Sequence, residues 1–380
     1  MATKLPLTRP LLDEGEERAV LEVLRSGWLV QGPVVAEFER LVAEYVGARY
    51  GIATSSCTTA LHLALVLLGV GPGDEVILPS FTFIASANAV TYVGATPVFA
   101  DVEPETHNLD ARSVATVISP RTKVIMPVHQ LGIAADMGPL TTLARAHGVT
   151  ILEDAAPAIG ATYNGTRVGG LGNMSCFSFH PRKVITTGEG GMVLTDDPEM
   201  ARRGRELRAH GMSVSDLARH TATRVIIEEY PAIGYNYRMS DLHAAVGVQQ
   251  MKKLDDLLAS RRAVAARYHE GLHDLEWLEL PASPPARPHT YQSFMVQLRP
   301  GAPKTRDEVM QELLEAGIPS RRGVMAIHLE ACYRGRGRSA PLPVTERAVQ
   351  DTLLLPIYAH MAETEQGLVI DNLRRILSAG

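Results

Sequence analysis

The sequence predicts an α/β protein: a large domain with a mostly parallel, mixed β-sheet flanked by helices, followed by a smaller C-terminal α/β domain. Three observations predict it. From about residue 50, short apolar segments alternate with helical ones, which is typical of parallel sheets covered on both faces. A long charged helical stretch, residues 239–272, follows, and a second set of alternating segments comes after it. We place the domain boundary near residue 250, between a large domain over 1–250 and a small domain over 251–380.

The individual elements are predicted in order along the chain. Amphipathic patterns predict two opening helices, separated by the turn-rich SGWLVQGP, at 13–25 and 34–46. Apolar segments predict strands at 75–80, 96–102, 123–129, 150–155, 173–179 and 190–196. Helical periodicity predicts helices between them at 58–69, 83–94 and 137–148. The small domain has a predicted strand and two predicted helices, at 291–299, 305–316 and 363–378. Residues 211–235 have neither the helical nor the strand pattern of apolar residues. We expect a long loop there that crosses the surface or reaches a partner chain.

Composition excludes several functional classes. The chain has 380 residues and a net charge of −5, which gives no electrostatic basis for binding nucleic acid or an anionic membrane. The N-terminus lacks an apolar signal segment, and the longest apolar run is too short to span a bilayer. The three cysteines, Cys57, Cys176 and Cys332, are far apart and form no CxxC pair, so we expect a reduced cytoplasmic protein.

Polar and aromatic residues gather where predicted strands end. In open parallel sheets, ligands lie beyond the carboxyl ends of the strands. Residues at or just after such ends are Ser55, Ser56, Thr58, Phe83, His129, Asp154, Ser178, His180 and Lys183. We expect one ligand to contact residues from several of these ends.

Three of these features together indicate the ligand. SSCTTAL places hydroxyl residues at a helix N-terminus, where free N–H groups bind anions, although Ser56 or Thr58 can equally be an ordinary cap. Asp154 in EDAAPAIGA can hold a protonated ring nitrogen, or it can cap a turn. Lys183 in SFHPRK can lose its proton and attack a carbonyl, or it can be a solvated loop lysine. An anion cradle, a carboxylate and a lysine at the strand ends of one sheet match a pyridoxal phosphate site.

Ordered motifs along nearly the whole chain resemble those of the sugar aminotransferase (DegT/DnrJ/StrS) family of fold-type-I pyridoxal phosphate enzymes. The motifs that carry the resemblance are SGWLVQGPVVAEFE, SSCTTALHLAL, PSFTFIASANAV, GATPVFADV, PVHQLG, EDAAPAIGA, FSFHPRKVITTGEGGMVLTDD and GYNYRMSDLHAAVGVQQ. A lone glycine-rich match would carry far less weight.

The resemblance implies roles for individual residues. Lys183 is then the Schiff-base lysine and proton shuttle, and Asp154 pairs with the pyridine nitrogen. Phe83 is implied to stack on the cofactor ring, unless it is a core aromatic. The implied phosphate ligands are Ser56, Cys57, Thr58 and Ser178, with Asn236 reaching in from the neighbouring subunit of a homodimer with shared active sites. Asn236 can also be only a turn residue. His180 is expected either to transfer a proton or to order the loop before the lysine.

Further residues are tentative substrate contacts. They are Trp28, Gln31, His129, Tyr235, Arg238 and Arg321. Trp28 and Gln31 can instead serve packing, and Tyr235 and Arg238 can brace a loop at the dimer interface. Arginines of SRRG (320–323) and YRGRGR (333–338) are candidates to meet a diphosphate, with a solvated basic loop as the alternative.

Three positions depart from the family pattern. Cys57 stands where many relatives have glycine, and its backbone N–H can still donate to a phosphate. Pro157 stands where many have glutamine or histidine, so a hydrogen bond to the 3-hydroxyl of the ring must come from elsewhere or be absent. Leu131 stands where many have an aromatic residue, so we expect an acceptor pocket of different shape.

The expected activity is a ping-pong transfer of an amino group to a nucleotide-linked keto-sugar. The amino donor is expected to be L-glutamate, or L-glutamine as in a few relatives, and pyridoxamine phosphate is the expected form between the two half-reactions. A keto-cyclitol (scyllo-inosose-type) aminotransferase is the alternative enzyme, and a non-catalytic regulatory protein that binds the cofactor is the alternative outside catalysis. A metal hydrolase is disfavoured because HExxH is absent, and GVGPGD (69–74) lacks the GxGxxG spacing of nucleotide dehydrogenases.

Overall fold

A mixed eight-stranded sheet forms the centre of the protein. The structure, a computed structural model, describes residues 5–214, 219–220 and 222–378. In spatial order, the strands of this sheet are β1 (Tyr50–Thr54), β9 (Gly191–Thr195), β8 (Met174–Ser178), β5 (Thr150–Asp154), β4 (Thr122–Ile125), β2 (Glu75–Pro79), β3 (Thr96–Ala100) and β13 (Arg338–Ser339). Every neighbouring pair is parallel except the two that involve β9. The predicted fold class, a mostly parallel mixed sheet, is confirmed.

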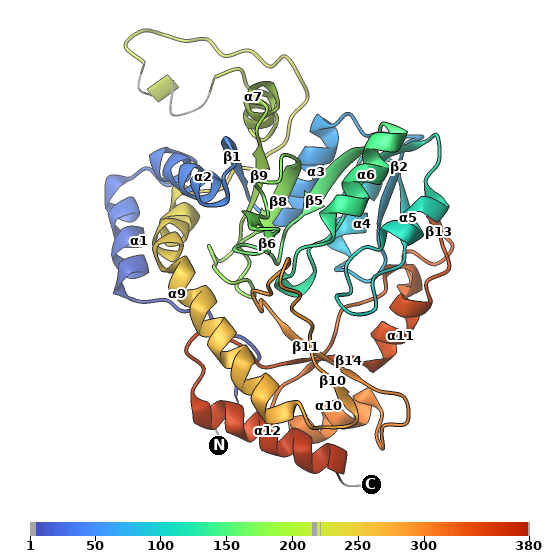
Figure 1. Ribbon diagram of the computed structural model, residues 1–380. Helices are drawn as coiled ribbons and strands as arrows, with labels where there is room; N and C mark the ends of the chain where they lie inside the picture. The colour runs from blue at the N-terminus through green and yellow to red at the C-terminus, as the bar shows by residue number, and fades with distance from the viewer. Residues whose placement is uncertain (1–4, 215–218, 221, 379–380) are drawn as a thin grey trace.

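Helices cover both faces of this sheet, as Figure 1 shows. In strand β2, Val76 and Leu78 belong to one apolar cluster and Ile77 to another, because successive side chains of a strand point to opposite faces. The helices that surround the sheet are α1 (Glu14–Ser26), α2 (Pro33–Val46), α3 (Cys57–Leu67), α4 (Ala85–Tyr92), α5 (Ala111–Val117), α6 (Met137–His147), α7 (Pro198–Leu207) and α9 (Asp241–Leu272). A hairpin of β6 (Thr162–Tyr163) and β7 (Thr166–Arg167) and the 3₁₀ turn η1 (Gln130–Gly132) complete this part.

A second, antiparallel sheet lies at the far end of α9 (Figure 1). Its strands, in spatial order, are β10 (Leu278–Glu279), β11 (Phe294–Leu298), β14 (Thr352–Leu355) and β12 (Arg321–Arg322). The other elements of this region are α10 (Arg306–Glu315), η2 (Ile327–Leu329), α11 (Pro343–Asp351) and α12 (Glu363–Ser378). Tyr268 and Leu272 of α9 join the core of this sheet, whereas Ala244 and Val248 of the same helix belong to a core of the large sheet. The predicted boundary near 250 lies inside α9, and the division of the chain at that residue stays a prediction.

Two elements differ in extent from their predictions for identifiable reasons. The predicted strand 123–129 ends at Ile125, because Pro127 two residues later cannot donate a ladder hydrogen bond. The predicted helix 83–94 begins only at Ala85, which leaves Phe83 in the loop between β2 and α4. The expected long loop at 211–235 is helical at Arg219 and His220 and otherwise irregular where it is described, and residues 215–218 and 221 of it lie outside the described part.

The topology brings several strand ends to one edge of the large sheet. Strands β5 and β8 run parallel and end at Asp154 and Ser178. Strand β1 leads directly into Ser56, which caps α3. Lys183 follows the end of β8 by five residues. Asp154, Ser178, Lys183 and the start of α3 therefore all lie at the edge of the sheet that the sequence predicts.

Candidate active site

The start of helix α3 presents unsatisfied backbone donors. Ser56 caps the helix: its hydroxyl accepts the N–H of Thr59 at 3.2 Å, and the Thr59 hydroxyl accepts the N–H of Ser56 at 3.0 Å. The N–H groups of Cys57 and Thr58, in the first turn, have no acceptor among the residues that the structure describes. Two free N–H groups at the positive end of a helix dipole suit a phosphate group.

Strand β9 passes close to this helix start because residue 191 is glycine. A Cβ at Gly191 would lie 2.4 Å from the carbonyl carbon and oxygen of Ser56 and 2.5 Å from the nitrogen of Cys57. Gly191 is paired with Ser178 of β8, whose side chain is buried at the same end of the sheet. Any side chain at position 191 would therefore push away the turn that carries the free N–H groups.

Lys183 lies in a tight turn beyond β8. Its backbone N–H donates to the carbonyl of His180 at 2.8 Å, and its side chain is half-buried. No described residue forms a hydrogen bond or ion pair with its ε-amine. Burial lowers the pKa of Lys183, and the neighbouring Cys57 and Asp154 oppose that shift while Arg182 adds to it. A lysine without a partner and with a lowered pKa is suited to act as a nucleophile.

Asp154 is the last residue of β5 and is 4% exposed. Its carboxylate accepts the Ser86 hydroxyl at 2.7 Å and the Ala156 N–H at 3.1 Å. Burial raises the pKa of Asp154, and these two hydrogen bonds work against the rise. The carboxylate is thus fixed in direction and would gain most from a cationic partner.

A buried hydrogen-bonded pair, His129 and Glu153, lies next to Asp154. The ring of His129 accepts the N–H of Ala135 at Nδ1 (3.0 Å), so the proton is on Nε2, which donates to Glu153 at 2.8 Å. Asn173 donates to the second oxygen of that carboxylate at 2.7 Å. His129 and Glu153 have 0% exposure, so the His129 ring presents no surface to a substrate in this structure, and its substrate contact stays a prediction. Its backbone N–H donates to the Asp154 carbonyl at 3.0 Å, which makes it a positioning residue.

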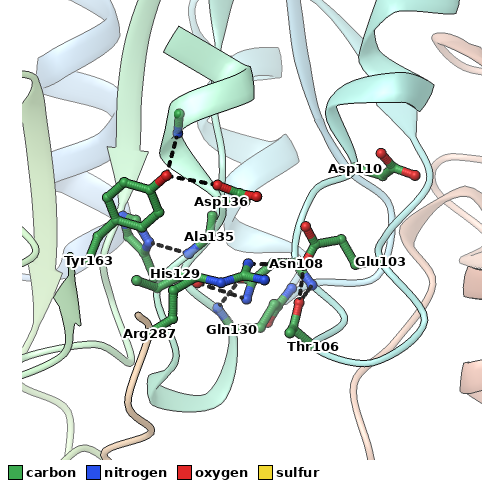
Figure 2. A network of polar contacts seen from close by, with 12 residues as sticks. Glu103, Thr106, Asn108, Asp110, His129, Gln130, Ala135, Asp136, Tyr163 and Arg287 are labelled. Atoms are coloured by element: carbon green, nitrogen blue, oxygen red, sulfur yellow. Dashed lines mark hydrogen bonds and ion pairs between the residues drawn. The ribbon is translucent and has the colours of Figure 1, made fainter. Parts of the chain in front are cut away.

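Figure 2 shows the polar network that holds the segment after His129. The Gln130 side chain donates to the carbonyl of Phe81, in the loop that carries Phe83, and the Gln130 N–H donates to Asn108 at 2.9 Å. Around this centre, the network continues through Thr106 to Glu103 and from Glu103 to Arg287, and separately from Tyr163 to Asp136 (Figure 2). The loops beyond β2 and β4 are therefore tied to each other and to the segment that follows β10.

The residues predicted to flank the cofactor lie on loops at this edge. Phe83 is 63% exposed, an unusual exposure for a phenylalanine, and its carbonyl accepts the Ser86 N–H at 3.2 Å. The ring of His180 accepts the N–H of Arg182 at 3.2 Å, so this histidine orders the turn before Lys183. Burial lowers the pKa of His180, which favours the neutral ring that this contact requires.

Most of the other predicted substrate residues lie at the turn before α2 and in the segment before α9, where the Tyr237 carbonyl accepts the Ser55 N–H at 2.8 Å. Tyr235 stacks on Tyr237 with ring centroids 4.8 Å apart, and Asn236 is exposed beside it. Gln31 and Arg238 line a cavity of about 330 Å³, and the carbonyl of Gln31 accepts the indole N–H of Trp28 at 3.3 Å. Within the described ranges, no hydrogen bond or ion pair joins Trp28, Gln31, Tyr235, Asn236 or Arg238 to Lys183 or Asp154.

The remaining predicted positions are also located. Arg321 is exposed in strand β12 of the small sheet. Pro157 is buried next to the site, and Leu131 is buried with Phe81 in a small apolar cluster, at a positive φ of 56°. Leu131 therefore offers little surface to a ligand, and the expected difference in pocket shape stays a prediction.

Several functional residues escaped the prediction from sequence. Ser86 binds Asp154, Asn173 binds Glu153, and Gly191 leaves room for the turn that carries the free N–H groups. Ser86 and Gly191 belong to motifs whose other members were singled out. A hydroxyl in the first turn of the helix after a strand end was the available signal for Ser86. For Asn173 no signal was available, because its contact depends on the pairing of β5 with β8.

Comparison with known proteins gives a consistent picture. The family model of the DegT/DnrJ/EryC1/StrS aminotransferases matches residues 10–374. The chain is 41% identical over 376 residues to a GDP-perosamine synthase of Caulobacter vibrioides, covering 98% of each chain. Among the described residues, no helix is both long and apolar enough to cross a membrane.

Two solved structures share this architecture. DesV of S. venezuelae, in complex with a ketimine intermediate, is 34% identical over 100% of both chains, with a TM-score of 0.89. DesI, in the presence of its TDP-sugar product, is 33% identical over 100% of this chain and 94% of its own, with a TM-score of 0.91.

Proposed function

The chain belongs to the DegT/DnrJ/EryC1/StrS aminotransferase family, and we propose that it transfers an amino group from L-glutamate to a nucleotide-linked keto-sugar, using pyridoxal phosphate. The single observation that supports this most is the meeting of three groups at one sheet edge. These are the free N–H groups at the start of α3, the buried carboxylate of Asp154 and the unpaired amine of Lys183.

The residues at this edge fit the cofactor. The cradle that a Cβ at Gly191 would fill suits its phosphate, with the hydroxyl of Ser178 at the same end. Asp154 is available for the ring nitrogen, Lys183 for the aldehyde carbon and the exposed ring of Phe83 for the ring face. When bound, pyridoxal phosphate supplies a ring that accepts electrons and so stabilises negative charge at the α-carbon of the donor.

This chain's own residues then account for the proton transfers. Asp154 keeps a proton on the ring nitrogen through a charge-assisted hydrogen bond, which Ser86 and Ala156 orient. The amine of Lys183 would take the proton from the donor α-carbon and deliver it to C4′ of the cofactor, and it would carry out the reverse transfer in the second half-reaction. The turn fixed by His180 keeps that amine at the mouth of the cradle.

We propose a homodimer in which each active site uses residues of both chains. Asn236 and the tentative substrate contacts Trp28, Gln31, Tyr235 and Arg238 belong to the site of the neighbouring chain in this proposal. Two observations support it. No hydrogen bond or ion pair between described residues joins this group to Lys183. Exposed apolar side chains also precede Asn236, and they are Val225, Ile227 and Ile233. A cytoplasmic location accompanies the proposal, supported by three free cysteines.

The relatives favour a nucleotide-linked sugar over a keto-cyclitol as acceptor. The named product of the Caulobacter vibrioides relative and the TDP-sugar product of DesI are both sugars attached to a nucleoside diphosphate. The chain covers 98% of the length of the first protein and 94% of the second.

The two half-reactions test this proposal separately. Holoenzyme mixed with L-glutamate alone should lose its visible absorbance band and release one 2-oxoglutarate per active site. A panel of keto-sugar nucleotides and keto-cyclitols is then added, and the nucleotide-linked sugars should restore the band. The Lys183→Ala variant is the control and should release none. Wild-type enzyme that releases no 2-oxoglutarate, or that responds only to the cyclitols, contradicts the proposal.

A further inference from the structure

Two arginines at the rim of the candidate active site have no acidic partner. Neither the guanidinium of Arg182 nor that of Arg321 forms a hydrogen bond or ion pair with any residue the structure describes. Both side chains are exposed, and they come from different parts of the chain. Gln292, which donates to the carbonyl of Arg182, leads into β11, and β11 and Arg321 both pair with β14 at Leu354. Burial and the positive charge of Arg321 both lower the pKa of Arg182.

The backbone of Arg182 is fixed on both sides. Its N–H donates to the ring of His180 at 3.2 Å, and its carbonyl accepts the side-chain amide of Gln292 at 2.7 Å. Since the next residue is Lys183, the guanidinium starts from the same rigid turn as the reactive amine. The positive charge of Arg182 also lowers the pKa of Lys183.

Arg321 is held against the same rim from the small sheet. Strand β12 pairs with β14, with Arg321 opposite Leu354. The chain that follows β12 runs along the loop before Phe83: Ala326 bridges Phe81, and the N–H of Ile327 donates to the carbonyl of Ser80 at 2.8 Å. The turn before Lys183 and strand β12 therefore carry these two positive charges on fixed backbone.

The structure separates Arg321 from the other arginines of the two basic segments. Three of them are already engaged: Arg322 with Glu330 at 3.2 Å, Arg334 with the carbonyl of Leu329 at 3.0 Å, and Arg338 with Glu75 at 3.0 Å. The guanidinium groups of these three arginines are therefore already occupied by carboxylates or a carbonyl.

Arg336 is unpartnered within the described part of the chain but lies at the wrong edge of the sheet. It precedes β13, which runs parallel to β3 with Arg338 opposite Val98. Arg336 is thus near the amino end of β3, whereas the candidate site is at the carboxyl ends. This makes Arg336 a matched control, because it is an exposed arginine without a role at the site.

We infer that Arg182 and Arg321 together bind the diphosphate of the nucleotide-linked acceptor, an inference that rests on the proposed function. Two adjacent guanidiniums match a group with two negative charges and offer planar, paired donors to its oxygens. The diphosphate is attached several bonds from the carbonyl that reacts, so it belongs at the rim and not beside the lysine. The mutual repulsion of the two arginines is relieved when that anion binds.

Calorimetric titration of the pyridoxamine phosphate form of the holoenzyme tests the inference. The probes are GDP, UDP and dTDP, with glutarate as a dicarboxylate that mimics the donor. The wild type should bind at least one nucleoside diphosphate. The Arg182→Gln and Arg321→Gln variants should each weaken that binding about 10- to 100-fold. Arg336→Gln should leave it within about twofold, and Arg321→Lys should fall between, because lysine keeps the charge but loses the paired donors.

A second readout distinguishes this inference from the proposed function. The release of 2-oxoglutarate from L-glutamate should change less than about twofold in Arg321→Gln, since no diphosphate takes part in that half-reaction. Unaltered cofactor absorbance and thermal midpoint show that the variants are folded. If they are not folded, the salt dependence of wild-type binding decides, because an arginine-bound diphosphate must bind more weakly as salt rises.

Three results overturn the inference. They are unchanged nucleoside diphosphate affinity in both glutamine variants, no wild-type binding of any of the three nucleotides, and a loss confined to glutarate or L-glutamate. The last result would reassign the arginines to the donor carboxylate. In each case, a normal reaction of the wild-type enzyme with L-glutamate still supports the proposed aminotransferase activity.

Discussion

Lys183 and Asp154 are both shifted toward their neutral forms by the same cause. Burial lowers the pKa of the lysine and raises the pKa of the aspartate, and in each case nearby groups only partly oppose it. A ligand with a carbonyl for the amine and a cationic ring nitrogen for the carboxylate relieves both effects. The pocket is therefore less stable empty than filled, as is common for sites that serve function before stability.

A covalent link at position 183 is the first prediction at this scale. Reduction of the holoenzyme with borohydride should fix the cofactor on the peptide that contains Lys183, detected by mass spectrometry, and the Lys183→Ala variant should have no label and no turnover. Lys252→Ala, at an exposed lysine of α9 that donates to Gln249, is the control and should keep the label on Lys183. Label on any other lysine in the wild type would contradict the assignment.

The Asp154→Asn substitution separates stability from activity. Because the pKa of Asp154 is raised in the folded state, ionisation costs stability above that pKa, and the cost is absent below the unfolded value near 3.8. The variant without cofactor should therefore melt about 1–3 °C higher at neutral pH, with the difference vanishing toward pH 4. Turnover should fall about 10- to 100-fold. Differential scanning fluorimetry across pH, with and without cofactor, measures the first effect. A variant that is less stable than the wild type at neutral pH would show that the carboxylate is not strained.

The contact between β9 and the start of α3 decides the shape of the cradle at the scale of elements. Gly191→Ala places a methyl group 2.4 Å from the Ser56 carbonyl, so the first turn of α3 must move. We expect a loss of about 1–3 kcal/mol in unfolding free energy and weaker binding of pyridoxal phosphate, measured by denaturant titration and by fluorescence. Gly71→Ala, where no atom lies within 4 Å of the added Cβ, should change neither. Unchanged cofactor affinity in Gly191→Ala would mean that the phosphate binds elsewhere.

Most of the elements predicted from an apolar run or a helical period are present, but β1, α5, α7, α11 and β14 were not predicted. Strands such as β5 and β8 are short apolar runs with clear turn residues at both ends, and they were predicted within a residue or two. Strands β12 and β13 have two residues each, and all four side chains are polar or charged. Neither strand therefore has an apolar pattern that the sequence could reveal. They exist because β14 and β3 offer a free edge, which only the tertiary fold reveals.

The candidate site also combines residues that the sequence could predict with contacts that only the tertiary fold determines. Lys183 and Asp154 were found because strand ends in a parallel sheet converge, a rule that acts on sequence order alone. His129 also follows a strand end, yet it points into the core, because its ring nitrogens are matched by Ala135 and by Glu153 on the neighbouring strand. Whether a side chain faces the ligand or the interior depends on contacts that sequence position does not encode.

At the scale of the whole molecule, a shared active site has a consequence for mixed dimers. Lys183→Ala and Asn236→Ala chains should each be nearly inactive alone. In a mixed dimer, one site combines the intact Lys183 of one chain with the intact Asn236 of the other. Random mixing should therefore restore about a quarter of the wild-type activity per site, measured after joint refolding or co-expression with two tags.

The same experiment contains its own controls. Mixing Lys183→Ala with Asp154→Ala should restore nothing, because in the proposal both residues serve the same site of one chain. Ile233→Asp, which places a charge on a side chain that is 94% exposed in the single chain, should shift the protein toward monomers in light scattering. Failure of the first mixture to regain activity, with mixed dimers present, would contradict a site built from two chains.

Strand β13 bears on the order in which this protein is made. It pairs with β3 through Arg338 and Ser339, so β3 acquires its outer neighbour only after nearly nine-tenths of the chain has left the ribosome. Until then β3, with its apolar Val98 and Phe99, is a bare sheet margin of the kind that invites pairing with other nascent chains. Synthesis that stalls before residue 338 leaves that margin open, and a chaperone has the whole of that interval in which to shield it.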